Sequence, residues 1–302
     1  MPKISEKPKY ISSKKTGPPP PSKIKGGELA KENEFPYLVD IRFSESQTIH
    51  FGAGSLISTD EFRPTDSPWI LTSRHNVVDF RDPIGVWVNL AVYPKYTNSW
   101  KNLTEAGKPY KIAKSFCYPW PADQGKKNLD DIALIKLDSV IIISVGDQKP
   151  KIESIRLTNT SYVGNDVDEI RLAGWGRTAE IEVFSDNLTS LRLSIAGAGM
   201  CEKIDIFDAK RRFCAVTTGP APCYGDRGSP VVVRGETDLQ IGVATRMIKQ
   251  DGSECPTNFG VMRVPYYRNW IKEVMDNEPS KYLCENLLNR QNKAFKKKHY
   301  QV

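Results

Sequence analysis

The sequence lacks several features that would place it in common functional classes. No long apolar run follows the basic residues at its start, which excludes a signal peptide in the sequence as it stands and, with the rest of the chain, predicts no membrane span. It has no zinc-finger, phosphate-loop or helix-turn-helix pattern, so nucleic acid is an unfavoured partner. No cluster of metal ligands occurs, and we expect no metal or other cofactor. Histidine is scarce, with only 3 among the 302 residues.

The positive charge lies near the two ends of the chain. The net charge is +7, of which residues 1–25 carry about +6 and residues 279–302 about +5, leaving the central part near −4. The first 23 residues are also rich in proline, a composition that predicts an extended, mobile tail. Basic ends of this kind bind heparin-like glycans or acidic proteins through counterion release. The simpler interpretation is that they only keep the ends of the chain solvated.

Five motifs follow one another in the chain and together resemble a known family. They are Gly52–Ile57, Trp69–Asn76 (Trp-Ile-Leu-Thr-Ser-Arg-His-Asn), Asp130–Leu137 (Asp-Asp-Ile-Ala-Leu-Ile-Lys-Leu), Leu172–Thr178 and Cys223–Pro230 (Cys-Tyr-Gly-Asp-Arg-Gly-Ser-Pro). Their order, spacing and residue types resemble those of trypsin-like serine proteases. The resemblance implies an all-β fold of two six-stranded antiparallel barrels with a C-terminal helix and an active-site cleft between the barrels.

The same resemblance divides the chain into three parts. Residues 1–23 form a basic, proline-rich tail that resembles a propeptide, residues 24–274 form the trypsin-like domain, and residues 275–302 form a basic C-terminal extension. The segment Lys23–Gly27 resembles the activation site of the family. Cleavage after Lys23 would free Ile24, which the resemblance pairs with Asp226.

The catalytic residues of the family are only partly present. The resemblance assigns the general base to His75 and the orienting carboxylate to Asp131, but it places Arg227 where the family has its nucleophilic serine. Arg227 cannot attack a carbonyl group, because its guanidinium is permanently charged and offers no lone pair. We expect it to reach toward Asp131 or His75 instead. Ser229 lies two residues further on, a displacement larger than productive geometry tolerates.

Compared with the family, the turn around position 227 is largely kept, whereas the substrate pocket beside it is altered. Gly225 keeps the glycine of the oxyanion turn, whose N–H groups the resemblance assigns to Gly225 and Arg227. The pocket floor corresponds to Ala221, which offers no carboxylate to a lysine or arginine substrate. The pocket wall corresponds to Thr245, Arg246 and Met247, and the methionine would obstruct a substrate side chain.

Six cysteines allow 15 pairings, among which composition alone cannot choose. The resemblance pairs Cys201 with Cys214 and Cys223 with Cys255, which leaves Cys117 and Cys284 as a third pair. A further disulfide of the family has lost both partners, since Gly52 and Asn76 stand at its two positions. Paired cysteines are typical of an oxidising compartment.

Three glycosylation sequons agree with secretion, each one being weak by itself. They begin at Asn102, Asn159 and Asn187. We therefore interpret the chain as a secreted, catalytically inactive homologue that binds another protein, such as a protease, a zymogen or an inhibitor, in an extracellular proteolytic or immune cascade. Two alternatives are a serine endopeptidase with residual or unusual activity and a cationic glycan-binding or antimicrobial protein on the same scaffold.

Overall fold

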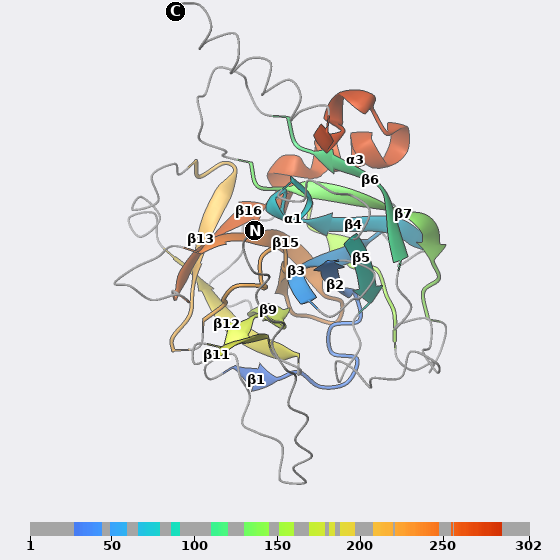
Figure 1. Ribbon diagram of the computed structural model, residues 1–302. Helices are drawn as coiled ribbons and strands as arrows, with labels where there is room; N and C mark the ends of the chain where they lie inside the picture. Colours follow the sequence, from blue (N-terminus) through green and yellow to red (C-terminus); the bar gives the residue numbers. More distant parts are fainter. Residues whose placement is uncertain are drawn as a thin grey trace, which may run out of the picture.

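The computed structural model consists mainly of β-strands, in two groups that follow the two halves of the chain (Figure 1). Apart from a short blue strand at the bottom of the view, the strands of the first half, blue to green, lie on the right, and most strands of the second half, yellow to orange, lie on the left. The described residues are 27–43, 49–58, 66–78, 86–90, 110–119, 130–144, 151–159, 169–178, 181–184, 188–196, 208–219, 221–247, 255 and 257–285.

Six strands of the first half close into a barrel in the order β2-β3-β4-β7-β6-β5. Every neighbouring pair is antiparallel. Alternate residues such as Val39 and Ile41 point inward, as the period of a strand requires, and pack with Leu56 and Ile70 inside the barrel. The strands are β2 (Leu38–Phe43), β3 (Ile49–Ile57), β4 (Ser67–Thr72), β5 (Val86–Leu90), β6 (Tyr110–Cys117) and β7 (Ala133–Ile141).

Six strands of the second half also pair in a closed circuit, in the order β9-β12-β13-β16-β15-β14 and back to β9. All of these pairs are antiparallel. The fold therefore confirms the predicted two-barrel architecture. The strands are β9 (Ile170–Gly174), β12 (Thr189–Ile195), β13 (Arg212–Val216), β14 (Pro230–Val233), β15 (Leu239–Met247) and β16 (Asn258–Arg263).

Several short elements accompany the barrels. Strand β1 adds to the edge of β12, β8 runs parallel to β15, and β10 pairs with β11. Helix α1 begins directly after the Trp-Ile-Leu-Thr strand of the first barrel and so fixes the position of His75. These elements are β1 (Glu28–Leu29), α1 (His75–Val78), β8 (Arg156–Leu157), β10 (Arg177–Thr178), β11 (Ile181–Phe184) and η4 (Ser280–Tyr282).

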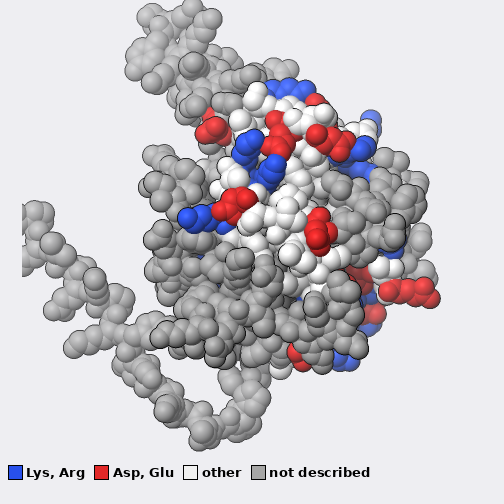
Figure 2. Space-filling view, turned by 90° about the vertical axis from the view of Figure 1, so that its right-hand side faces the viewer, with Lys and Arg blue, Asp and Glu red and all other residues white. Residues whose placement is uncertain are grey.

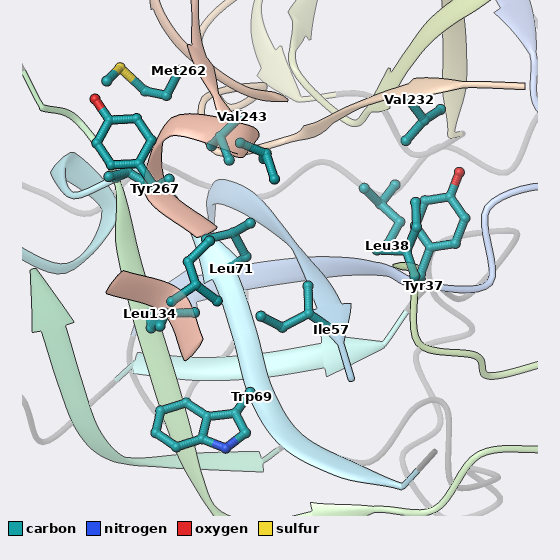
Figure 3. Close-up of a cluster of buried hydrophobic side chains, with 14 of the residues drawn as sticks. Tyr37, Leu38, Ile57, Trp69, Leu71, Leu134, Val232, Val243, Met262 and Tyr267 are labelled. Atoms are coloured by element: carbon teal, nitrogen blue, oxygen red, sulfur yellow. The ribbon is translucent and has the colours of Figure 1, made fainter. Parts of the chain in front are cut away.

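The largest apolar cluster joins the two barrels and the C-terminal helix. Figure 3 shows side chains of the first barrel, such as Leu71 and Leu134, in one cluster with Val243 and Met262 of the second barrel and Tyr267 of the helix. Because burial of apolar surface is the main favourable term in folding, this shared cluster stabilises the contact between the two halves.

Helix α3 (Val264–Asn277) closes the second half. Its buried residues Val264, Tyr267, Ile271 and Val274 repeat at intervals of three and four, which places them on one face of the helix. The helix ends at Glu278, which adopts a left-handed conformation with φ 45° and donates its N–H to the carbonyl of Val274. The C-terminal helix that the family resemblance implies is therefore present.

The folded unit continues past the predicted domain boundary at residue 274. That boundary falls inside α3, and the chain beyond the helix packs against the first barrel. Cys284 is buried and bonded to Cys117 of β6, and Leu283 forms an isolated bridge with Phe116. The described part of the C-terminal extension is thus attached to the domain rather than separate from it.

Charged side chains of both signs lie next to one another on the described surface that Figure 2 shows. The ion pairs of the described residues include Lys114–Glu278 and Lys281–Glu273. Most of the excess positive charge of the sequence falls outside the described residues. No helix within the described ranges is long and apolar enough to cross a membrane.

Candidate functional site

The site is organised around the turn Gly225–Ser229, which lies between the barrels. Gly225 and Gly228 have φ angles of 98° and 88°, a backbone conformation that favours glycine. A Cβ on Gly228 would lie only 2.1 Å from the carbonyl oxygen of Ala53 in β3. The turn can therefore approach the first barrel this closely only because residue 228 has no side chain.

Asp226 holds the turn from its buried side. The residue has 0% exposure, and its Oδ1 and Oδ2 accept hydrogen bonds of 2.8 Å from the backbone N–H groups of Gly176 and Cys223. A Cβ on Gly176 would meet Asp226 Oδ2 at 2.1 Å, so the glycine is required for the carboxylate to reach this position. The predicted partner Ile24 lies outside the described residues, and its pairing with Asp226 stays a prediction.

Asn76 of α1 ties the first barrel to the same turn. Its Nδ2 donates to the carbonyl oxygens of Arg227 (2.9 Å) and Ala53 (3.2 Å) and to Thr72 Oγ1 (3.0 Å). The backbone N–H of Ala53 also donates to the Arg227 carbonyl, at 2.9 Å. A Cβ on Gly52 would lie 2.4 Å from Asn76 Nδ2, so the two altered cysteine positions do face each other. An amide at this place thus replaces a covalent link with hydrogen bonds.

A buried histidine supports the other end of the turn. His50 of β3 places Nε2 2.8 Å from the carbonyl oxygen of Gly225 and Nδ1 2.6 Å from Asp40 Oδ1. Both oxygens are acceptors, so both contacts are hydrogen bonds only when each ring nitrogen carries a proton. The second oxygen of Asp40 accepts from Arg42 Nε at 2.7 Å, which forms a buried charged group beside the turn.

His50 and Asp40 are site residues that the motif analysis missed. One signal was available, because His50 is one of only three histidines and lies two residues before Gly52, the first residue of a quoted motif. Asp40 gave no signal, since a single carboxylate in a strand looks like an ordinary solvent-facing residue. Only the register of β2 on β3, with Arg42 opposite His50, brings the group together.

The two residues assigned to acid–base chemistry are adjacent in space. Asp131 Oδ1 accepts a 2.9 Å hydrogen bond from the backbone N–H of His75, and the side chain of His75 is exposed. Beside them, burial lowers the pKa of the Arg74 guanidinium, while the negative charges of Asp131 and Asp130 act in the opposite direction. The structure thus brings together the histidine and the carboxylate that the sequence predicted.

Asp130 has a structural role that the sequence did not indicate. Its Oδ1 accepts from Tyr267 Oη at 2.6 Å, and its Oδ2 accepts from Arg211 Nη1 at 2.8 Å. Burial, together with the carboxylate, raises the pKa of Tyr267 far above its usual range, so the phenol remains protonated. Asp130 therefore joins the first barrel to α3 and to the residues before β13.

Arg227 is half-buried and does not reach the carboxylate we expected it to meet. Among the described residues, no carboxylate pairs with its guanidinium, and Asp131 interacts with His75 and Arg74 instead. Ser229 is fully buried, and its Oγ has no hydrogen-bond partner within the described ranges. A Cβ on Gly174 would lie 3.3 Å from this hydroxyl, so the serine faces strand β9.

The predicted pocket residues are partly described. Ala221 and Thr245 are buried, and Thr245 Oγ1 donates to the carbonyl of Gly260 at 3.0 Å. Arg246 and Met247 belong to β15, but their side chains lie outside the described part of the chain. Their assignment to a pocket wall stays a prediction. No group of three or more His, Cys, Asp or Glu residues within the described ranges could hold a metal ion.

Two of the expected disulfides are present, Cys223–Cys255 and Cys117–Cys284. Cys214 is also disulfide-bonded, and its predicted partner Cys201 lies outside the described residues. Asn159 is exposed, as a glycosylation site requires, whereas Asn102 and Asn187 lie outside the described residues.

Fold and site define a two-barrel protein of the serine-protease class, with a histidine and a carboxylate beside a glycine-rich turn. A family profile described as "Trypsin" matches residues 24–271, and the chain belongs to this family. It is 23% identical to mouse (Mus musculus) "Serine protease 28" over 84% of the chain and 89% of that protein. It is 27% identical to "Collagenase" of Hypoderma lineatum over 83% of the chain and 86% of that protein. It also matches "Transmembrane protease serine 11G" of Rattus norvegicus at 23% identity over 83% of the chain, but covers only 55% of that protein.

Proposed function

We propose that this protein is a catalytically inactive member of the trypsin family that acts by binding another protein. The observation that carries the proposal is the identity of residue 227. Arginine occupies the position that the motif comparison assigns to the nucleophile, and a guanidinium cannot form an acyl-enzyme. Loss of the serine in a serine protease lowers turnover by about 10⁶.

The surroundings of Arg227 support this proposal, because the neighbouring hydroxyl, that of Ser229, is not exposed to a substrate. The Ser229 side chain faces Gly174 and is inaccessible to solvent. Its hydroxyl would need a rearrangement of the turn before it could meet a substrate. The turn is held by hydrogen bonds to Asp226 and Asn76, which oppose such a rearrangement.

We place the protein outside the cell, with a protease, a zymogen or an inhibitor as its partner. Disulfides are typical of oxidising compartments, and the structure contains Cys117–Cys284 and Cys223–Cys255. Several relatives are named as proteases, and a protein of the same shape can compete for the surfaces that a protease offers. Glycans bound through the basic ends remain a separate alternative, supported only by composition.

Peptide hydrolysis tests the proposal. The purified protein, cleaved after Lys23, is incubated with casein and with peptide p-nitroanilides that end in Ala, Leu, Phe, Lys or Arg. The expected result is no turnover, and the Ser229→Ala variant should behave identically. Turnover by the unaltered protein that disappears in Ser229→Ala would overturn the proposal and make Ser229 the nucleophile.

An active endopeptidase is the second candidate, and the comparisons give it specific support. The chain belongs to the trypsin family, and its relatives "Serine protease 28" and "Transmembrane protease serine 11G" are named as proteases. The hydrogen bond from His75 to Asp131 also keeps two of the three catalytic positions together. The hydrolysis experiment separates the two candidates directly, because only the endopeptidase would release product.

A further inference from the structure

Helix α1 carries two residues of the candidate site but is too short to be stable alone. It contains one helical turn, in which the N–H groups of Val77 and Val78 both donate to the carbonyl of Arg74 at 3.0 Å. An isolated turn is unfavourable, because several residues must be fixed for very few hydrogen bonds. Contacts from outside the helix must therefore hold α1, and with it His75 and Asn76, in place.

The first half of α1 is held by polar contacts. The backbone N–H of His75 donates to Asp131 Oδ1 at 2.9 Å. Asn76 Nδ2 donates to the carbonyl of Arg227, also at 2.9 Å. These bonds connect the helix to the segment before β7 and to the Gly225–Ser229 turn. Asn76 is therefore the link through which the position of α1 reaches the backbone of residue 227.

The second half of α1 rests on a disulfide. Val77 and Val78 pack against a small buried cluster, whose members are Cys117, Ala133 and Cys284. Cys117 and Ala133 are paired neighbours on β6 and β7, whereas Cys284 follows α3 and is bonded to Cys117. The two cysteines are only 0% and 3% exposed. The disulfide thus forms part of the apolar surface on which the helix lies.

The segment Glu278–Cys284, called here the C-terminal strap, is fastened to the first barrel at both of its ends. At its start, the carboxylate of Glu278 pairs with one lysine of β6 and one of β7. Near its end, Leu283 forms a bridge with Phe116 of β6, and the next residue forms the disulfide. Because all of these attachments go to β6 or β7, the strap can keep its place without support from α1.

We propose that the C-terminal strap positions the candidate site through α1. The disulfide provides an apolar surface for the valines of the helix, the helix sets the place of His75, and Asn76 transmits that place to the Arg227 carbonyl. Protein interiors are closely packed, so removal of one wall of a cluster leaves its neighbours without contacts and lets them shift. Cys284 is a positioning residue, since it acts on the site only through the helix. The inference goes beyond the proposed function, because it holds for an inactive binding protein and for an active enzyme alike.

The test removes the disulfide and follows motion within the native state, which does not depend on the global free energy of unfolding. The full-length variant Cys117→Ala/Cys284→Ala is compared with the unaltered protein by ¹⁵N relaxation. In the unaltered protein, the backbone order parameters of Val77 and Val78 should be about 0.85, the value of rigid backbone. We expect them to fall toward about 0.6 or lower in the variant, the range of flexible backbone.

Further measurements separate a positioning role from a general structural one. The amide resonance of Gly228 should shift in the variant, because Gly228 shares a peptide group with the Arg227 carbonyl that Asn76 holds. Strands β9 and β14, which pair in the second barrel, should keep their order parameters. Lys281→Ala is the matched control, because this exposed residue of the strap pairs with Glu273 of α3 and should change neither quantity.

A second variant keeps the proposal testable where loss of the disulfide prevents folding. Val77→Ala/Val78→Ala leaves the disulfide intact and removes the contact from the side of the helix, so the Gly228 resonance should shift here too. A Gly228 resonance that stays in place in whichever of the two variants folds would overturn the proposal, as would changes spread equally over α1, β9 and β14. Neither result would touch the proposed function, which the hydrolysis experiment tests separately.

Discussion

The two faces of the Gly225–Ser229 turn differ sharply, although its residues are consecutive. On the buried face, Asp226 is inaccessible to solvent and accepts hydrogen bonds from Gly176 and Cys223. On the other face, Arg227 is half-buried and has no carboxylate partner among the described residues. Under the proposed function, the difference teaches that the scaffold of a protease site can persist while arginine takes the place of the group that performs the chemistry.

The buried face should be the more sensitive of the two to substitution. Asp226→Ala would leave the N–H groups of Gly176 and Cys223 without an acceptor, and each such buried group costs about 1–3 kcal/mol. We therefore expect the free energy of unfolding to fall by about 3 kcal/mol or more, measured by urea denaturation. Asp138→Ala on the exposed part of β7 is the control and should change stability by less than about 0.5 kcal/mol. Equal effects of the two variants would contradict the supporting role of Asp226.

The disulfide that the family resemblance implies at positions 52 and 76 provides a second test of the contact between the first barrel and the turn. Gly52→Cys combined with Asn76→Cys should form a bond, because a Cβ on Gly52 points directly at the side chain of residue 76. We expect the oxidised double variant to be more stable than its reduced form by about 2–4 kcal/mol. Thermal unfolding with and without reductant measures this difference, and thiol titration counts the free cysteines. Two titratable extra thiols after oxidation would show that the two positions do not face each other.

Substitution of Asn76 alone should lower the free energy of unfolding by an intermediate amount. Asn76→Ala removes the donor to Arg227, Ala53 and Thr72, so we expect a loss of about 1–3 kcal/mol in the free energy of unfolding. Asn277→Ala is a matched control, because that amide is exposed and makes a single 3.3 Å hydrogen bond within α3. The account predicts that the NMR signal of the Arg227 amide moves in Asn76→Ala only.

The smallest effect concerns an ion pair far from the turn. Lys114 and Lys136 hydrogen-bond to Glu278 and lower the pKa of its carboxyl below 4.5. Because the folded protein keeps this group ionised where the unfolded chain takes up a proton, its contribution is present above pH 4.5 and is lost as the pH falls below that value. Glu278→Gln should cost less than about 1 kcal/mol at pH 7 and nothing at pH 2. Thermal unfolding at both pH values measures the difference, and an equal loss at both would contradict the assignment.

The fold and the adjacency of the motif residues could be predicted from the sequence, because both depend on residue patterns that are local in the chain. The strands, the C-terminal helix and the neighbouring placement of His75 and Asp131 follow from residue patterns that a family resemblance can transfer. The supports of the turn could not be predicted in the same way. His50, Asp40 and Asn76 act through contacts with residues more than 100 positions away or across a strand register, and neither the scarcity of histidine nor the motif around Asn76 indicates which residues they contact.

The burial of Ser229 is a second instance of this limit. Its two-residue displacement from position 227 already argued against a catalytic role, but only the coordinates show that its side chain is buried and faces Gly174. For Arg227, the sequence showed the charge but not its surroundings. Its charge was evident from the sequence, but the absence of a carboxylate beside it among the described residues required coordinates.

Labelling with a fluorophosphonate probe tests the central claim most directly, because the probe reacts only with an activated hydroxyl. The unaltered protein and Arg227→Ser, both cleaved after Lys23, are treated side by side and compared by in-gel fluorescence. The account predicts no label on the unaltered protein and clear labelling of Arg227→Ser, since the supported turn needs only the hydroxyl to become reactive. Labelling of the unaltered protein, or failure of Arg227→Ser to label, would contradict it.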